Sequence, residues 1–149
     1  MSLAADQPYA QAAAEIVGER SKAVFAHKRG RVLDLGDIEG VHEMRVATRR
    51  LRAALEVFGP GLAARKRAAR AVRDVKSLAA ALGERRDRDV QLELLEGLRG
   101  ECEGAELRAV DLLAGELRTE QRHANTELAD ALTHAKRTGL RRRLKGLAR

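Results

Sequence analysis

Apolar residues recur every three or four positions along most of the chain, in segments separated by glycine and proline. This spacing places the apolar side chains on one face of an α-helix. The segments are rich in Ala, Leu, Arg and Glu, which favour helices, and poor in the β-branched and aromatic residues that favour strands. The pattern predicts an all-α fold in one domain spanning residues 1–149: an antiparallel bundle of about four long helices plus a short basic C-terminal helix.

Residues that start and stop helices set the expected boundaries. Pro8 suits the first turn of a helix, Asp37 is a good N-cap, and Gly59-Pro60 ends the helix that Asp37 begins. Gly83 and Gly139 are further predicted breaks. Residues 1–7 are expected to be disordered or a cloning remnant. We expect helices over about residues 8–29, 38–58, 62–82, 87–98 and 102–135, with a short tail helix after Gly139.

The helical spacing also predicts which side chains face the core. The segment 102–135 has heptad spacing, which favours packing on neighbouring helices of the same chain over a coiled coil with a partner. In the first helix the predicted core residues are Ala12, Ile16, Ala23 and either Ala26 or Phe25. In the second they are Val41, Met44, Thr48, Leu51, Leu55 and Phe58, and in the third Ala64, Ala68, Val72, Val75, Ala79 and Leu82.

Charge is unevenly distributed along the sequence. The formal net charge is +7, and the pI is about 10.3. Residues 41–76 contain ten Lys/Arg and three Asp/Glu, whereas residues 77–135 contain seven Lys/Arg and thirteen Asp/Glu. Residues 136–149 contain seven Lys/Arg and no acid. This distribution predicts an anionic partner that binds the second and third helices and the tail.

Several classes of site and location are disfavoured by the residues that the chain lacks. One cysteine cannot form an internal disulfide, and four scattered histidines do not resemble a metal site, so we expect neither metal nor cofactor. The sequence has no run of 18 apolar residues and no export signal. A cytoplasmic protein without membrane insertion is therefore expected, and the basic tail has too few leucines for a firm membrane anchor.

A basic stripe runs beside the core stripe of the second helix. It consists of His42, Arg45, Arg49 and Arg52, each of which follows an apolar residue by one position, about 100° further round the helix. The stripe is about 15 Å long, enough to face several phosphates. By the same geometry, Arg50 points elsewhere, nearly opposite the core.

The third helix repeats this arrangement with Arg65, Arg73 and Lys76, so the two basic stripes can face one cleft. Arg67 and Arg70 are interpreted instead as a solvated face.

The segment VHEMRVATRRLR at residues 41–52 resembles the signature of the CHAD family, the conserved histidine α-helical domain. Downstream, Lys76, Leu82-Gly83, Arg86-Asp87 and Asp89-Val90 are similar to that family's leucine-glycine turn and the arginine-aspartate pair after it. The resemblance covers about residues 10–148. Asp87 and Asp89 are also interpreted as helix caps.

The resemblance implies a helical domain that binds inorganic polyphosphate along a basic cavity, in a family that includes partners of triphosphatase domains and proteins of polyphosphate granules. A full domain of this family has two helical bundles, and the match corresponds to the first. The second is expected from a longer native chain, another protein or a second copy in a C2 homodimer. From the resemblance and the spacing together, the expected ligand-binding residues are His42, Arg45, Arg49, Arg50, Arg52, Arg73, Lys76 and Arg86.

Two other classes of function compete with polyphosphate binding. An enzyme needs a nucleophile, an acid–base pair or a metal. His42-Glu43 begins like a zinc-protease motif, but Val46 occupies the position of the second histidine, so we expect no catalysis. Sequence-independent binding to a double-stranded nucleic-acid backbone is the alternative function, because arginine-rich helices also neutralise phosphodiesters. Single strands are disfavoured, since only three aromatic residues are available for base stacking.

Overall fold

The computed structural model describes residues 6–62 and 64–148, and all the regular elements in this part of the chain are helices. The prediction of an all-α fold with four long helices and a short C-terminal helix is confirmed. The helices are α1 (Tyr9–Phe25), α2 (Arg29–Val32), α3 (Ile38–Phe58), the 3-10 turn η1 (Gly59–Gly61), α4 (Arg65–Arg99), α5 (Gly104–Arg137) and α6 (Leu140–Leu147).

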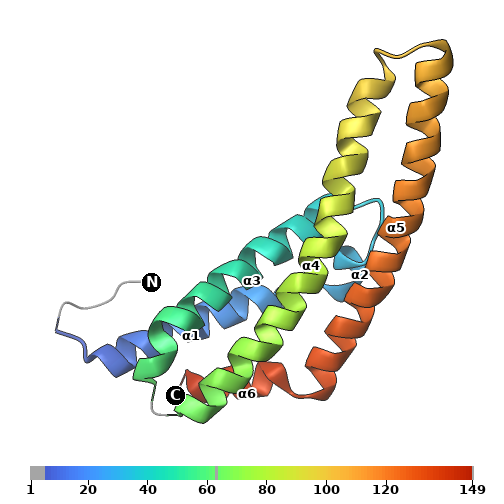
Figure 1. Cartoon of the computed structure of the whole chain (residues 1–149). Coiled ribbons are helices and arrows are strands. Elements are labelled where there is room, and N and C mark those ends of the chain that lie inside the picture. Colours follow the sequence, from blue (N-terminus) through green and yellow to red (C-terminus); the bar gives the residue numbers. More distant parts are fainter. Residues whose placement is uncertain (1–5, 63, 149) are drawn as a thin grey trace.

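The two longest helices, α4 and α5, form an antiparallel hairpin that runs the length of the molecule (Figure 1). α3 packs on the lower half of α4, and α1 packs on α3. α6 turns back beneath the bundle and lies against α1 and α4. The upper part of the hairpin therefore extends beyond the other helices.

α3 begins and ends where the sequence predicts. Asp37 is its N-cap, and the Asp37 side chain accepts a hydrogen bond from the Gly40 backbone N–H at 3.0 Å. Arg31 Nε donates to the other Asp37 oxygen at 2.7 Å. The Arg31 and Gly40 hydrogen bonds hold the pKa of Asp37 below its usual range, so the cap stays ionised. At the other end, η1 stops the helix at Gly59-Pro60.

The α3 core stripe is also confirmed. Five of its six predicted residues are buried, and the sixth, Phe58, is half-buried and packs against the core. The α4 stripe is buried or half-buried throughout. The buried residues of α5 recur at the heptad positions, and they pack on α4 of the same chain. The predicted bundle packing of this segment is therefore correct.

The predicted core-facing side of α1 is only partly correct, because Ile16 and Phe25 pack against the core but the most deeply buried residues are others. Ala12, Ile16 and Phe25 are half-buried, and Ala23 and Ala26 are exposed. Small apolar residues surround most of this helix, so the sequence does not select one face, and contacts with α3 and α6 decide it. The buried residues are instead Ala13, Val17, Ser21 and Val24.

Two predicted helix boundaries are also wrong. The first helix does not reach Arg29, because it ends at Phe25 and a separate turn, α2, follows. The break at Leu82-Gly83 is absent, since α4 continues through both residues. A glycine lowers helix stability without ending the helix when long helices pack on both sides of it.

The continuous α4 also overturns the interpretation of Asp87 and Asp89 as helix caps, because both lie in the middle of this helix. Asp89 is buried and lies 3.2 Å from Arg85 Nη2, measured from Oδ1. Gln121 Nε2 of α5 donates to the same oxygen at 2.7 Å. The Arg85–Asp89–Gln121 cluster therefore joins the two helices of the hairpin.

The C-terminal tail is part of the core. Leu140, Leu144 and Leu147 of α6 are buried, so the apolar face of the tail packs in the bundle. Among the described residues, no helix has the length and apolarity needed to cross a membrane. At the N-terminus, residues 1–5 of the segment expected to be disordered lie outside the described residues. Gln7 Nε2 donates to Glu15 Oε1 at 2.7 Å.

Candidate functional site

The basic stripe of α3 meets α4 at Glu56. Arg52 Nε lies 3.8 Å from Glu56 Oε1, and Lys76 Nζ, on α4, lies 3.3 Å from the same oxygen. All three side chains are between 42% and 55% exposed, so these cations remain accessible to a solvent-borne anion. One carboxylate between two cations leaves this junction with a net positive charge.

The other stripe residues continue away from this junction along α3. Arg49 is exposed, and Arg45 and His42 are half-buried. Their spacing of three and four residues puts them on the same side of α3 as Arg52. These four residues thus form a row of cationic or ionisable groups next to α4, which we call the α3 row.

Of the α4 residues in the predicted site, Arg86 is largely buried and Arg73 is exposed. Arg86 has a side chain only 15% exposed, and its Nη2 lies 3.9 Å from Glu93 Oε2. Its Nη1 atom is buried without a hydrogen-bond partner. Arg86 lies inside α4, not after a turn as the sequence suggested.

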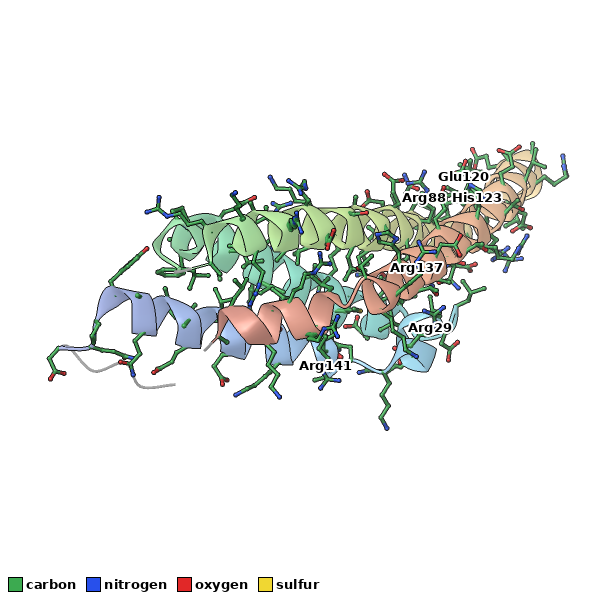
Figure 2. The ribbon with its side chains drawn as sticks, turned by 90° about the horizontal axis from the view of Figure 1, so that it is seen from below. Arg29, Arg88, Glu120, His123, Arg137 and Arg141 are labelled. Atoms are coloured by element: carbon green, nitrogen blue, oxygen red, sulfur yellow. The ribbon has the colours of Figure 1, made fainter. Side chains whose placement is uncertain are left out.

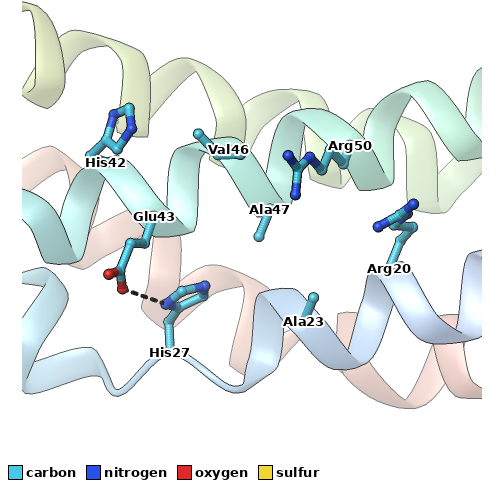
Figure 3. Close-up of a pocket in the computed structure, with 8 residues that line it drawn as sticks. All are labelled: Arg20, Ala23, His27, His42, Glu43, Val46, Ala47 and Arg50. Atoms are coloured by element: carbon cyan, nitrogen blue, oxygen red, sulfur yellow. Dashed lines mark ion pairs between the residues drawn. The ribbon is translucent and has the colours of Figure 1, made fainter.

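Arg50 lies on a different side of α3 from the α3 row. It lines a pocket of about 340 Å³ between α1 and α3, shared with Arg20 and His27. Figure 3 shows Arg50 and Arg20 at one end of this pocket, and the pair of His27 Nδ1 and Glu43 Oε2, 3.9 Å apart, at the other. His42 belongs to the α3 row and also lines this pocket, so it lies between the two surfaces. The predicted residues are therefore divided between two surfaces.

The pocket beside Arg50 is only partly cationic. Arg31 Nη1 lies 2.6 Å from Glu43 Oε2, so the Glu43 carboxylate is engaged by Arg31 as well as by His27. This carboxylate opposes an anion at that end of the pocket. By contrast, the α3 row contains no acid before Glu56. The α3 row is therefore the stronger candidate surface for a polyanion.

A comparison with known protein families identifies the family of this chain. A family model described as the CHAD domain matches residues 15–149. The chain belongs to the CHAD family. No curated protein and no solved structure matches it. CHAD domains are associated with polyphosphate binding, and they are generally binding or structural modules rather than catalysts.

This CHAD chain also has a basic groove between the start of α4 and the tail helix α6. The charge pattern predicts that both segments bind an anion, but not that they lie side by side. The groove has a volume of about 620 Å³. Its cationic residues are Arg65, Lys66, Arg67, Arg70 and Arg143. The sequence indicates a solvated face for Arg67 and Arg70, and both are exposed, but they share this groove with Arg143, which lies more than 70 positions later in the chain. No local pattern in the sequence indicates that α6 folds back against α4.

Other cations of this CHAD chain are dispersed over the hairpin and the other helices. In Figure 2, which views the molecule from below, Arg88, Glu120 and His123 lie together on the hairpin, Arg137 lies at the end of α5, and Arg29 and Arg141 lie nearer the other helices. Arg88 Nε is 3.3 Å from Glu120 Oε2, and Arg88 Nη1 is 2.8 Å from Glu84 Oε2, so acids neutralise this part of the hairpin. Arg141 lies over the Phe25 ring, 5.8 Å from its centroid. Arg88 and Arg141 are therefore engaged by other side chains of the same chain.

Proposed function

We propose that this CHAD chain binds inorganic polyphosphate, without catalysis, along the α3 row and the facing residues of α4. The observation that carries the proposal is the approach of Arg52 and Lys76, from two helices, to one carboxylate at the end of an otherwise acid-free row. The proposed ligand-binding residues there are His42, Arg45, Arg49, Arg52, Arg73, Lys76 and Arg86. Arg50 is proposed to contribute from the α1 side of α3.

The proposed mechanism is multivalent electrostatic capture. Guanidinium groups bind phosphate oxygens with two parallel hydrogen bonds, and such charge-assisted bonds are among the strongest in proteins. Like charges at a spacing of three or four residues repel one another by a few tenths of a kcal/mol per pair. A bound polyanion would remove this repulsion along the row. Arg52 and Lys76 would exchange Glu56 for phosphate oxygens.

The positions of the aromatic residues argue against recognition of bases. Tyr9 and Phe58 pack on each other with ring centroids 6.2 Å apart, and Phe25 lies beneath Arg141. None of the three belongs to the α3 row, and base stacking is a main source of affinity for single-stranded nucleic acids. Duplex backbone binding, which needs no aromatic residues, is the alternative that an experiment must separate from polyphosphate binding.

The test is a titration with long-chain polyphosphate at physiological salt, in competition with duplex DNA at equal phosphate concentration. The variants are Arg45→Glu/Arg49→Glu in the α3 row and Arg108→Glu/Arg122→Glu on exposed positions of α5. Both carry the same change in net charge, so a general electrostatic effect would weaken them equally.

We expect selective binding of polyphosphate that is lost in the α3 variant and kept in the α5 variant. Equal preference for duplex DNA would instead support the nucleic-acid alternative. An equal loss of polyphosphate affinity in both variants would show that binding depends on the net charge of the protein and not on the α3 row.

We further propose that the chain acts in the cytoplasm, at polyphosphate granules, and that a second copy or a separate protein supplies the second wall of the site. The part of the hairpin that extends beyond the other helices is the surface on which we propose that this second wall packs.

A further inference from the structure

Four cations of α4 occur at every third position: Arg67, Arg70, Arg73 and Lys76. A step of three residues turns by about 300° on an α-helix, which is a drift of about 60° per step. The four residues, which we call the α4 band, therefore pass diagonally round the helix. Over nine residues the band rises about 13.5 Å and crosses to the opposite side of α4.

The two ends of the α4 band reach the two basic surfaces. At one end, Lys76 Nζ lies 3.3 Å from Glu56 Oε1, at the junction with the α3 row. At the other end, Arg67 and Arg70 line the groove with Arg143 of α6. Arg67 lies close to α6, because a Cβ atom added at Gly146 would be only 3.0 Å from Arg67 Nη1. The band thus connects the α3 row with the α4–α6 groove.

The three arginines of the α4 band form no ion pairs with acids in the described part of the chain. Arg67, Arg70 and Arg73 are exposed, and within residues 6–62 and 64–148 no carboxylate forms a salt bridge with them. Asp74, the acid nearest to them in sequence, pairs with Arg143, so one cation of the groove is neutralised while the three arginines of the band are not. The first turn of α4 also has no acidic residue and no side-chain cap, although it begins with Arg65-Lys66-Arg67. Cations at this end of a helix are disfavoured by the helix dipole, so an anion there would be stabilising.

We infer that one flexible phosphate polymer crosses α4 along the band and occupies both the α3 row and the α4–α6 groove. The inference rests on the proposed function and specifies its ligand: a polymer long and flexible enough to pass round a helix that is about 10 Å across. A short oligophosphate would reach one surface only. Duplex DNA, with a persistence length of about 150 base pairs, cannot follow this path.

The experiment compares tripolyphosphate with long-chain polyphosphate over a range of salt concentrations. The variants are Arg67→Gln/Arg70→Gln at the α6 end and Arg45→Gln/Arg49→Gln in the α3 row, with Arg108→Gln/Arg122→Gln on α5 as the charge-matched control. All six side chains except that of Arg45 are exposed, so the folds should be retained, and circular dichroism would check this.

We expect the α6-end variant to bind the long polymer more weakly while its tripolyphosphate affinity in the α3 row is unchanged. The dependence of log K on log salt should become less steep, because two fewer cations of the protein displace counterions from the polymer. The α5 control should keep the slope of the parent chain.

A parent-like slope and affinity in the α6-end variant, together with loss of binding in the α3 variant, would overturn the inference and leave the proposed function intact. An equal loss for tripolyphosphate and the long polymer in the α6-end variant would also overturn the inference. Absence of polyphosphate binding by the parent chain would remove the proposed function and the inference together.

Discussion

At the scale of single residues, the most unusual group is the buried Arg85–Asp89 pair. Both side chains are fully buried. Burial lowers the pKa of Arg85 and raises the pKa of Asp89, because the interior disfavours both charges, while their mutual attraction acts in the opposite direction. Such pairs contribute little net stability, but removing one partner leaves an uncompensated buried charge.

The first prediction concerns this pair. Asp89→Ala should lower the free energy of unfolding by about 3–5 kcal/mol, because Arg85 is left buried without a counter-ion and Gln121 loses its acceptor. Arg85→Met/Asp89→Leu should recover most of this loss, since no buried charge remains. Urea unfolding of the parent chain and both variants measures the effect. A double variant as unstable as the single one would show that the ion pair itself is required.

At the scale of elements, the continuity of α4 decides how the cationic groups are arranged. The low helix propensity of glycine predicts a break in the helix at Gly83. The packing of α3 and α5 against α4 keeps this segment helical. Because α4 is one helix, Arg86 lies on the same rigid element as Lys76. A hinge after Leu82 would have separated them.

The second prediction tests this continuity. Gly83→Ala should raise the free energy of unfolding by about 0.5–1 kcal/mol, because alanine favours a helix interior and the added Cβ would meet no atom within 4 Å. Gly139→Ala is the matched comparison. Gly139 has φ +69°, so this variant should be destabilised by about 1–2 kcal/mol. Thermal unfolding measures both, and destabilisation by Gly83→Ala would contradict a continuous helix.

At the scale of the whole molecule, the hairpin extends past the helices that cover its lower half (Figure 1). On this extension Val90, Leu94 and Leu98 are 47%, 64% and 42% exposed. Their spacing of four residues puts them on one side of α4, and nothing in the described part of the chain covers them. An exposed apolar stripe of this kind is typical of an interaction surface.

The third prediction follows from this stripe. The chain should self-associate at micromolar concentration, and Leu94→Glu should shift it to monomer by placing a charge in the apolar contact. Leu35→Glu, at a residue 39% exposed outside the hairpin, is the control and should leave the association unchanged. Sedimentation equilibrium gives the masses, with and without polyphosphate. A parent chain that stays monomeric under both conditions would contradict the homodimer.

The sequence by itself determined the helical class, the bounds of α3, its core stripe and the row of His42, Arg45, Arg49 and Arg52 beside that stripe. These features depend on local propensity, capping and a spacing of 3.6 residues per turn, all of which are encoded within one segment. The buried face of α1 was not determined in this way, because its alanines offer several nearly equivalent apolar faces.

Only the tertiary structure decided which cations lie together. The packing of α1 on α3 puts Arg50 beside Arg20, away from the α3 row, and the return of α6 brings Arg143 to Arg67 and Arg70. The physical reason is that helices pack so as to bury apolar surface. Exposed cations contribute little to this choice, and their positions follow from how the helices pack. A groove built from residues far apart in sequence therefore appears only when the helices are assembled.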